Sequence, residues 1–133
     1  MSPRETEPTA EIERRISEEI RGIHEQAYGQ EVAAVRTLFV DDMVICVLDI
    51  RLLTHERTLL DAGQPSDHIR TVRQQFQETI RTTFAAAVEH MTGRRVIGFV
   101  SDTHVEDPPF AVEFFRLAPE VESSDQERDE GPA

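Results

Sequence analysis

Apolar side chains recur along the chain with two periods, one typical of helices and one of strands. Over residues 10–27, isoleucines follow one another at spacings of 4, 4 and 3, which places them on one face of a helix. Over residues 67–91 the spacing is again 3 or 4 and predicts a longer helix. Its expected core-facing stripe is Ile69, Val72, Phe76, Ile80, Phe84, Val88 and Met91.

Four segments rich in β-branched and aromatic residues predict strands at 32–40, 43–50, 95–102 and 110–117. Only Asp41 and Asp42 separate the first two, which favours a tight antiparallel hairpin. Thr54 is a suitable N-cap for a short helix over about 55–62. The resulting order, α-β-β-α-α-β-β, predicts an α+β fold. We expect a four-stranded, mainly antiparallel sheet of two β-hairpins, with helices packed on one face.

The two ends of the chain differ in composition from its middle. Residues 1–9 and 119–133 contain almost nothing that could enter a core, so we expect a disordered N-terminal tail and a disordered, acidic C-terminal tail. Residues 10–118 are dense in apolar side chains and suffice for one domain.

The net charge of −12 narrows the possible partners. A chain this acidic has no broad basic face with which to neutralise phosphates, so nucleic acid binding is not expected. No apolar run approaches the length of about 20 residues that a spanning helix needs, and no signal peptide opens the chain. We therefore expect a cytoplasmic protein without direct membrane insertion. The single Cys46 lies in an apolar run and is expected to be buried and unreactive.

The best candidate for a metal site is Asp102, His104 and Glu106. Their spacing of two places them on one side of an extended strand, and carboxylate with imidazole is a usable ligand set. The alternative is a polar strand end before Pro108. Arg94 and Arg95 form a basic pair next to Gly93 and could contact an anion. They could equally complement the carbonyl end of the preceding helix, which we favour.

Local catalytic signatures are absent from the sequence: it contains no phosphate-binding glycine loop, no G-x-S-x-G, no C-x-x-C and no H-E-x-x-H. His55 with Glu56 could act as a general base, but a capped helix start explains the pair better. His24, His68 and His90 read as solvated helix positions. We expect no catalytic residues and no cofactor.

The isoleucine stripe of the first helix has two interpretations. It could close the core of one chain, or it could form the seam between two helices of a homodimer. Because dimerisation helps a small domain to bury surface, we favour a homodimer whose possible face is Ile12, Ile16, Ile20 and Ile23.

Several stretches together resemble the MpsC-like family, once catalogued as a domain of unknown function. They are residues 27–29 (AYG), 41–45 (DDMVI), Leu53-Thr54 with Glu56 and Leu59-Leu60, 73–84 (RQQFQETIRTTF), 91–96 (MTGRRV) and 99–102 (FVSD). Many relatives continue after the Tyr-Gly with a turn that bears a basic residue. Here the chain reads Gly29-Gln30-Glu31, so that basic contact does not carry over.

The resemblance implies a small soluble partner of a membrane-potential-generating system linked to cation and inorganic-carbon (bicarbonate) transport. It brings no established catalytic residues. We therefore expect a non-catalytic accessory or adaptor protein that binds a subunit of a membrane transport complex and, through it, lies at the inner face of the membrane. The alternative is a sensor domain for a small ligand or metal that acts as a homodimer.

Overall fold

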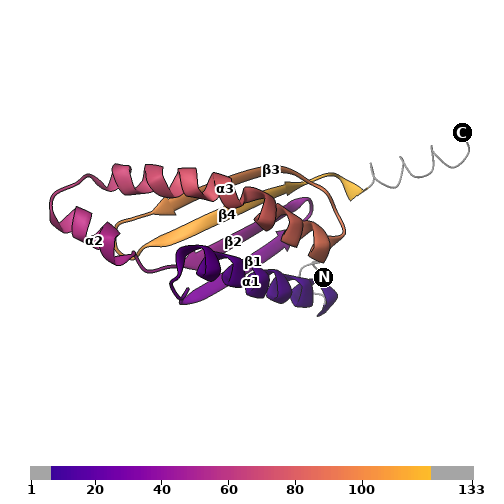
Figure 1. The fold of residues 1–133 in the computed structure, drawn as a ribbon. Helices are drawn as coiled ribbons and strands as arrows, with labels where there is room; N and C mark the ends of the chain where they lie inside the picture. Colours follow the sequence, from indigo (N-terminus) through magenta and orange to yellow (C-terminus); the bar gives the residue numbers. More distant parts are fainter. Residues whose placement is uncertain (1–6, 121–133) are drawn as a thin grey trace, which may run out of the picture.

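A computed structural model of the chain describes residues 7–120, and within this range helices and strands follow the expected order (Figure 1). The elements are α1 (Glu7–Tyr28), β1 (Ala34–Val40), β2 (Met43–Asp49), α2 (Thr54–Asp61), α3 (Ser66–Thr92), β3 (Val96–His104) and β4 (Phe110–Leu117). The expected tails at 1–9 and 119–133 fall mostly outside the described residues. The first helix begins at Glu7, three residues before the predicted start.

The four strands form one antiparallel sheet in the order β1-β2-β4-β3. The β1–β2 hairpin turns at Asp41 and Asp42 as predicted, and Asp41 adopts a positive φ of 54°. The α+β prediction is confirmed. Strand order is a new finding: β4 lies between β2 and β3, so the C-terminal strand occupies the centre of the sheet.

Two long helices cover one face of this sheet, α1 against β1 and α3 against β3 (Figure 1). Ile16 and Ile20 of α1 are buried in the core, and Ile12 and Ile23 are partly buried against it. The isoleucine stripe is therefore the core-facing side of α1. A seam between two chains would need these side chains at the surface, so any dimer must use another face.

The predicted stripe of α3 is confirmed in its C-terminal half and changes in its N-terminal half. Phe84 and Val88 are fully buried, whereas Val72 is 48% exposed. Ile69 is buried as predicted, and the other buried positions near the start of α3 are Arg73 and Gln77. Two polar side chains thus enter the core where the apolar spacing predicted Val72 and Phe76.

The two faces of the sheet carry opposite kinds of side chain along neighbouring rows. Directly paired residues of an antiparallel sheet point to the same face. The register aligns a polar row on the helix-covered face: Thr37, Cys46, Glu113 and Ser101. One residue along each strand, it aligns an apolar row on the uncovered face: Leu38, Ile45, Phe114 and Val100.

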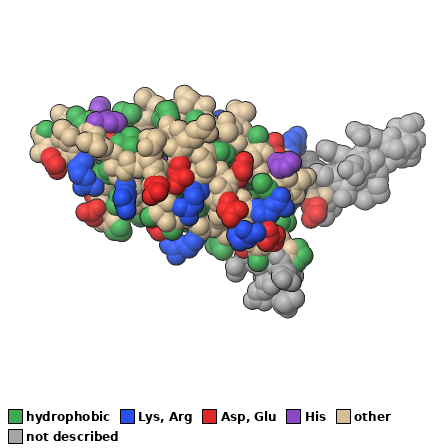
Figure 2. Space-filling model, turned by 60° about the horizontal axis from the view of Figure 1, so that its bottom comes forward, with side chains coloured by type: hydrophobic (Ala, Val, Ile, Leu, Met, Phe, Trp, Pro, Cys, Tyr) green, Lys and Arg blue, Asp and Glu red, His purple; other side chains and the backbone are tan. Residues whose placement is uncertain are grey.

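The exposed side of α1 carries charges of both signs. Arg14 pairs with Glu11 and with Glu18 one helical turn away. Figure 2, which brings the lower side of Figure 1 forward, shows acidic and basic side chains interspersed there. Among residues 7–120, no helix is long and apolar enough to cross a membrane.

Candidate functional site: an edge pocket and a buried polar cluster

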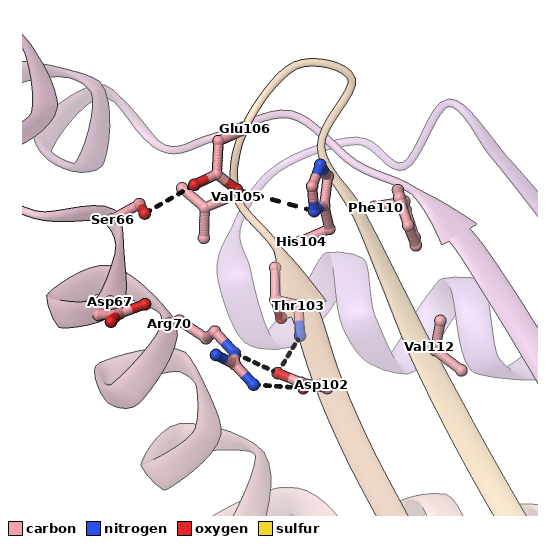
Figure 3. Close-up of a pocket in the computed structure, with 10 residues that line it drawn as sticks. All are labelled: Ser66, Asp67, Arg70, Asp102, Thr103, His104, Val105, Glu106, Phe110 and Val112. Carbon is pink, nitrogen blue, oxygen red and sulfur yellow. Dashed lines mark hydrogen bonds and ion pairs between the residues drawn. The ribbon is translucent and has the colours of Figure 1, made fainter.

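An open pocket of about 420 Å³ lies beside strand β3, where the start of α3 meets the β3–β4 turn (Figure 3). Asp102, His104 and Glu106 all line it, together with Ser66 and Arg70 from α3. The three candidate metal ligands that the sequence suggested therefore line the same pocket. It did not anticipate the contribution of α3, which comes from more than 30 residues earlier in the chain.

Each of these three side chains already has a partner in the protein. Arg70 Nε and Nη2 each donate a hydrogen bond of 2.8 Å to the Asp102 carboxylate, and these bonds lower the Asp102 pKa. The Ser66 hydroxyl donates to Glu106 at 2.8 Å, and His104 Nδ1 lies 3.7 Å from Glu106 Oε1. Within the described part of the chain, no group of three or more His, Cys, Asp or Glu side chains is arranged to hold a metal. Metal binding here stays a prediction.

Arg94 connects two segments of the chain at the end of the sheet where β4 ends. Its guanidinium donates to the Ala118 carbonyl at 2.7 and 3.2 Å and to the Asp41 carbonyl at 2.8 Å. It thereby ties the β1–β2 turn to the end of β4. Arg95 is exposed. Anion contact by this pair stays a prediction, and Arg95 is the more exposed of the two side chains.

A second site lies inside the molecule, where α1, α2 and α3 converge. Arg73 of α3 forms a bidentate ion pair with Glu56 of α2, at 2.7 Å from Nε and 2.9 Å from Nη2. Both side chains are buried, 2% and 6% exposed. Burial alone would raise the Glu56 pKa, but hydrogen bonds from Arg73 and from the Leu53 N–H outweigh it and lower that pKa. Glu56 thus both caps α2 and neutralises a buried guanidinium.

Tyr28, at the end of α1, covers this ion pair. Its ring centroid lies 4.5 Å from the Arg73 guanidinium carbon, a cation–π contact. Gln77 Nε2 donates to the Tyr28 hydroxyl at 2.9 Å, and the His24 ring stacks on Tyr28 at 4.4 Å. Burial lowers the His24 pKa to about 4, and the Arg73 charge contributes. His24 is therefore neutral and buried, not the solvated histidine that its charged sequence neighbours predicted.

Glu113 lies on the polar row of the sheet with no exposed surface. Burial raises its pKa to about 8, so the carboxyl is protonated at neutral pH. Its charged form would act on Tyr28 and on Cys46, because it raises the pKa of both groups. The polar row and the Arg73–Glu56–Tyr28 contacts are thus electrostatically coupled. We call His24, Tyr28, Glu56, Arg73, Gln77 and Glu113 the buried polar cluster.

Several atoms of this region have no hydrogen-bond partner among the described residues. Buried polar atoms usually have one, often an ordered water. The unpartnered atoms are both ring nitrogens of His24, Arg73 Nη1, Gln77 Oε1, Ser101 Oγ and both carboxyl oxygens of Glu113. A separate open pocket of about 260 Å³ adjoins the cluster, lined by Tyr28, Glu56 and Arg73 together with His55 and apolar side chains.

The chemistry of the cluster favours binding over catalysis. It presents donors and acceptors without a net charge, because Arg73 offsets Glu56 and Glu113 is protonated. Burial raises the pKa of Cys46 to about 12 and that of Tyr28 to about 12, so neither group ionises at neutral pH and supplies a nucleophile. Ordered water or a small polar molecule would satisfy the unpartnered atoms.

Sequence reasoning missed this cluster, although two signals pointed to it. Arg73 and Gln77 continue the helical spacing from Ile69, so they fall on the apolar line of α3. Glu113 alternates with Ala111 and Phe115 along the buried side of β4. Charged or amide side chains in phase with the core are rare unless they are paired.

Comparison with known proteins gives one match. The family model described as the Na⁺-translocating membrane potential-generating system (MpsC) matches residues 9–112. No curated protein and no solved structure matches the chain.

Proposed function

The chain belongs to the MpsC family, and from that membership we propose that it is a cytoplasmic accessory protein of a membrane-potential-generating Na⁺ system. The observation that carries the proposal is the match over residues 9–112, which spans α1 through the first part of β4. The protein would bind a membrane subunit of the system and regulate or support cation and bicarbonate transport without catalysing a reaction.

The state of the reactive side chains supports a non-catalytic role. Cys46 is fully buried, and Glu56 is held by Arg73 and by the Leu53 N–H. In the edge pocket, Arg70 donates two hydrogen bonds to the Asp102 carboxylate. Nucleophilic or general-base catalysis needs such groups to be free and suitably ionised.

Affinity capture of the tagged protein from detergent-solubilised native cells tests the association. We expect mass spectrometry to identify a multi-spanning transport subunit that stays bound in moderate salt. A deletion strain should show a lower membrane potential and greater dependence on added bicarbonate, and the wild-type gene should restore both. An unchanged potential in the deletion strain, together with capture of the protein alone, would overturn the proposal.

The unpartnered atoms of the buried polar cluster favour a second candidate function, a sensor for a small polar ligand. Calorimetric titration with bicarbonate, nucleotides and divalent metals tests it. A His104→Gln variant is the control for metal binding in the edge pocket. Heat from bicarbonate or a nucleotide that persists in this variant would support the cluster as the site, and silence with every titrant would exclude the sensor.

A further inference from the structure

The uncovered face of the sheet is apolar along a row that crosses all four strands. Leu38 and Val100, on the two edge strands, are 45% and 62% exposed. Ile45 and Phe114 lie between them on the central strands. Val47 and Val112 occupy the middle of the next row on the same face. No described helix covers this face (Figure 1).

An antiparallel sheet whose second face meets water normally carries polar side chains on that face. A contiguous apolar patch on a small protein marks a surface that binds something. We propose that the occupant is a second copy of this chain, and that two sheets pack face to face in a symmetric dimer. This inference is independent of the transport proposal, because it depends only on the surface of the chain itself.

The symmetry follows from the register of the strands. A two-fold axis parallel to the strands, placed between β2 and β4, sets β2 of one copy over β4 of the other and β1 over β3. Ile45 of each copy then lies over Phe114 of the other copy, and Leu38 over Val100. Each apolar side chain of the row meets an apolar side chain, in the aligned packing of two twisted sheets.

The charges at the ends of the neighbouring row are complementary under the same axis. This row reads Arg36, Val47, Val112 and Asp102 across the sheet. The axis places Arg36 of one copy opposite Asp102 of the other, twice per dimer. Arg36 is exposed and makes no ion pair among the described residues. Asp102 already binds Arg70, but a carboxylate can accept further hydrogen bonds.

The edge pocket acquires a role in this arrangement. Asp102 and Val112 line it from the uncovered face of the sheet, beside Arg70 (Figure 3). An arginine side chain from the second copy would enter there and complete a guanidinium–carboxylate–guanidinium group. The apolar row would supply the affinity, and the two arginines would fix the register of one sheet on the other.

The size of the face limits the area that the dimer can bury. Four strands about 4.8 Å apart, each about seven residues long, give a face of about 440 Å² per copy. The dimer would therefore bury roughly 900 Å², near the lower bound of about 1,000 Å² for stable interfaces. Interfaces of this size are typically weak, so we expect a dissociation constant on the order of micromolar.

Sedimentation equilibrium of the full chain measures the oligomeric state directly. We expect a concentration-dependent mass that approaches about 30 kDa, twice the 15.1 kDa of one chain. Val100→Asp should weaken association at least tenfold because it places a carboxylate in the apolar row. Val72→Asp is the matched control: Val72 is 48% exposed but lies on α3, and this variant should associate like the wild type. Circular dichroism verifies that both variants fold.

A charge exchange tests the register. Arg36→Glu and Asp102→Arg should each weaken self-association, because like charges then face each other at both ends of the row. An equimolar mixture of the two variants should associate more tightly than either alone, since both contacts become attractive again.

Three results would overturn the dimer. They are a wild-type chain that stays at 15.1 kDa well above micromolar concentration, a dimer that Val100→Asp leaves intact, and a mixture no tighter than its components. A monomer that sediments with lipid vesicles, or binds a membrane subunit through Val100, would assign the face to that occupant instead.

Discussion

At one level of the sheet, the two faces carry the opposite kinds of side chain from those expected in a simple globular domain. The covered face carries a polar row, with Glu113 fully buried at its centre. The uncovered face carries an apolar row, with Val100 62% exposed at its edge. The rows are one residue apart along each strand. The alternation of the strands is therefore regular, but at this level of the sheet the polar side chains face inward.

Only some of the polar atoms in the polar row have a hydrogen-bond partner among the described residues. Ser17 of α1 and Thr37 share a hydrogen bond of 2.7 Å, and the Thr37 hydroxyl donates to Cys46 Sγ at 3.4 Å. Glu113 and Ser101 have unpartnered oxygens among the described residues. Burying polar groups in this way costs stability, and exposing an apolar row costs solubility. Such departures from local consistency are typical of functional sites, and the covered face and the open face each contain one.

The largest expected effect comes from the buried ion pair. Arg73→Met leaves the Glu56 carboxylate buried without its partner, and we expect the free energy of unfolding to fall by about 3–5 kcal/mol. Urea denaturation monitored by circular dichroism measures the change. Adding Glu56→Gln should recover part of the loss, because it removes the uncompensated charge.

Arg70→Met is the matched control, since Arg70 makes the same bidentate contact with Asp102 at the surface. Its effect on unfolding should be several-fold smaller because solvent screens the exposed pair. Equal effects of the two substitutions would contradict the assignment of the Arg73–Glu56 pair to the core.

The next effect is a dependence of stability on pH. The Glu113 carboxyl ionises near pH 4.5 in the unfolded chain and at about pH 8 in the folded chain. Between these values the folded chain binds the extra proton, so the stabilisation is complete below pH 4.5 and is lost as the pH rises to 8. His24 acts in the opposite sense, because its pKa falls from 6.5 to about 4 on folding. Its contribution is present above pH 6.5 and is lost as the pH falls towards 4.

The interval from pH 6.5 to 8 therefore isolates Glu113 from His24. We expect the unfolding free energy of the wild type to decrease by about 2 kcal/mol across it, the value for one proton over 1.5 pH units. Glu113→Gln should remove this slope. Denaturant titrations at several pH values measure it, and a slope that persists in the variant would assign the titration to another group.

The smallest expected effect is that of a valine-to-threonine substitution, made once on each face of the sheet. Val44→Thr places a hydroxyl on the covered face at a fully buried position, and we expect a loss of about 1–2 kcal/mol. Val100→Thr makes the same change on the open face and should alter the unfolding free energy of the dilute monomer by less than about 0.5 kcal/mol. Thermal unfolding at low protein concentration measures both. Similar losses would mean that the open face is covered even in the dilute chain.

Much of the fold was predictable because the helices and strands follow the local spacing of apolar residues. The β4 limits at 110 and 117 agree with the alternation of apolar residues there, and Gly93 ends α3 with a φ of 70° as a C-terminal glycine should. The edge pocket was half predictable: Asp102 and His104 are close in sequence, whereas Arg70 reaches them from α3. Periodicity reports which face of an element is apolar, and it carries no information about which distant element packs against that face.

The sequence by itself determined the element order, the first hairpin and the acidic character of this chain, since each depends on neighbouring residues or on composition alone. Only the tertiary structure decided that α1 uses its isoleucines inside one chain and that Arg73 meets Glu56. It also brought Gln77 to Tyr28, 49 residues away. These contacts depend on how the helices pack across the sheet. Local sequence patterns do not predict the strand order of that sheet. For that reason the buried polar cluster and the apolar open face became visible only in three dimensions.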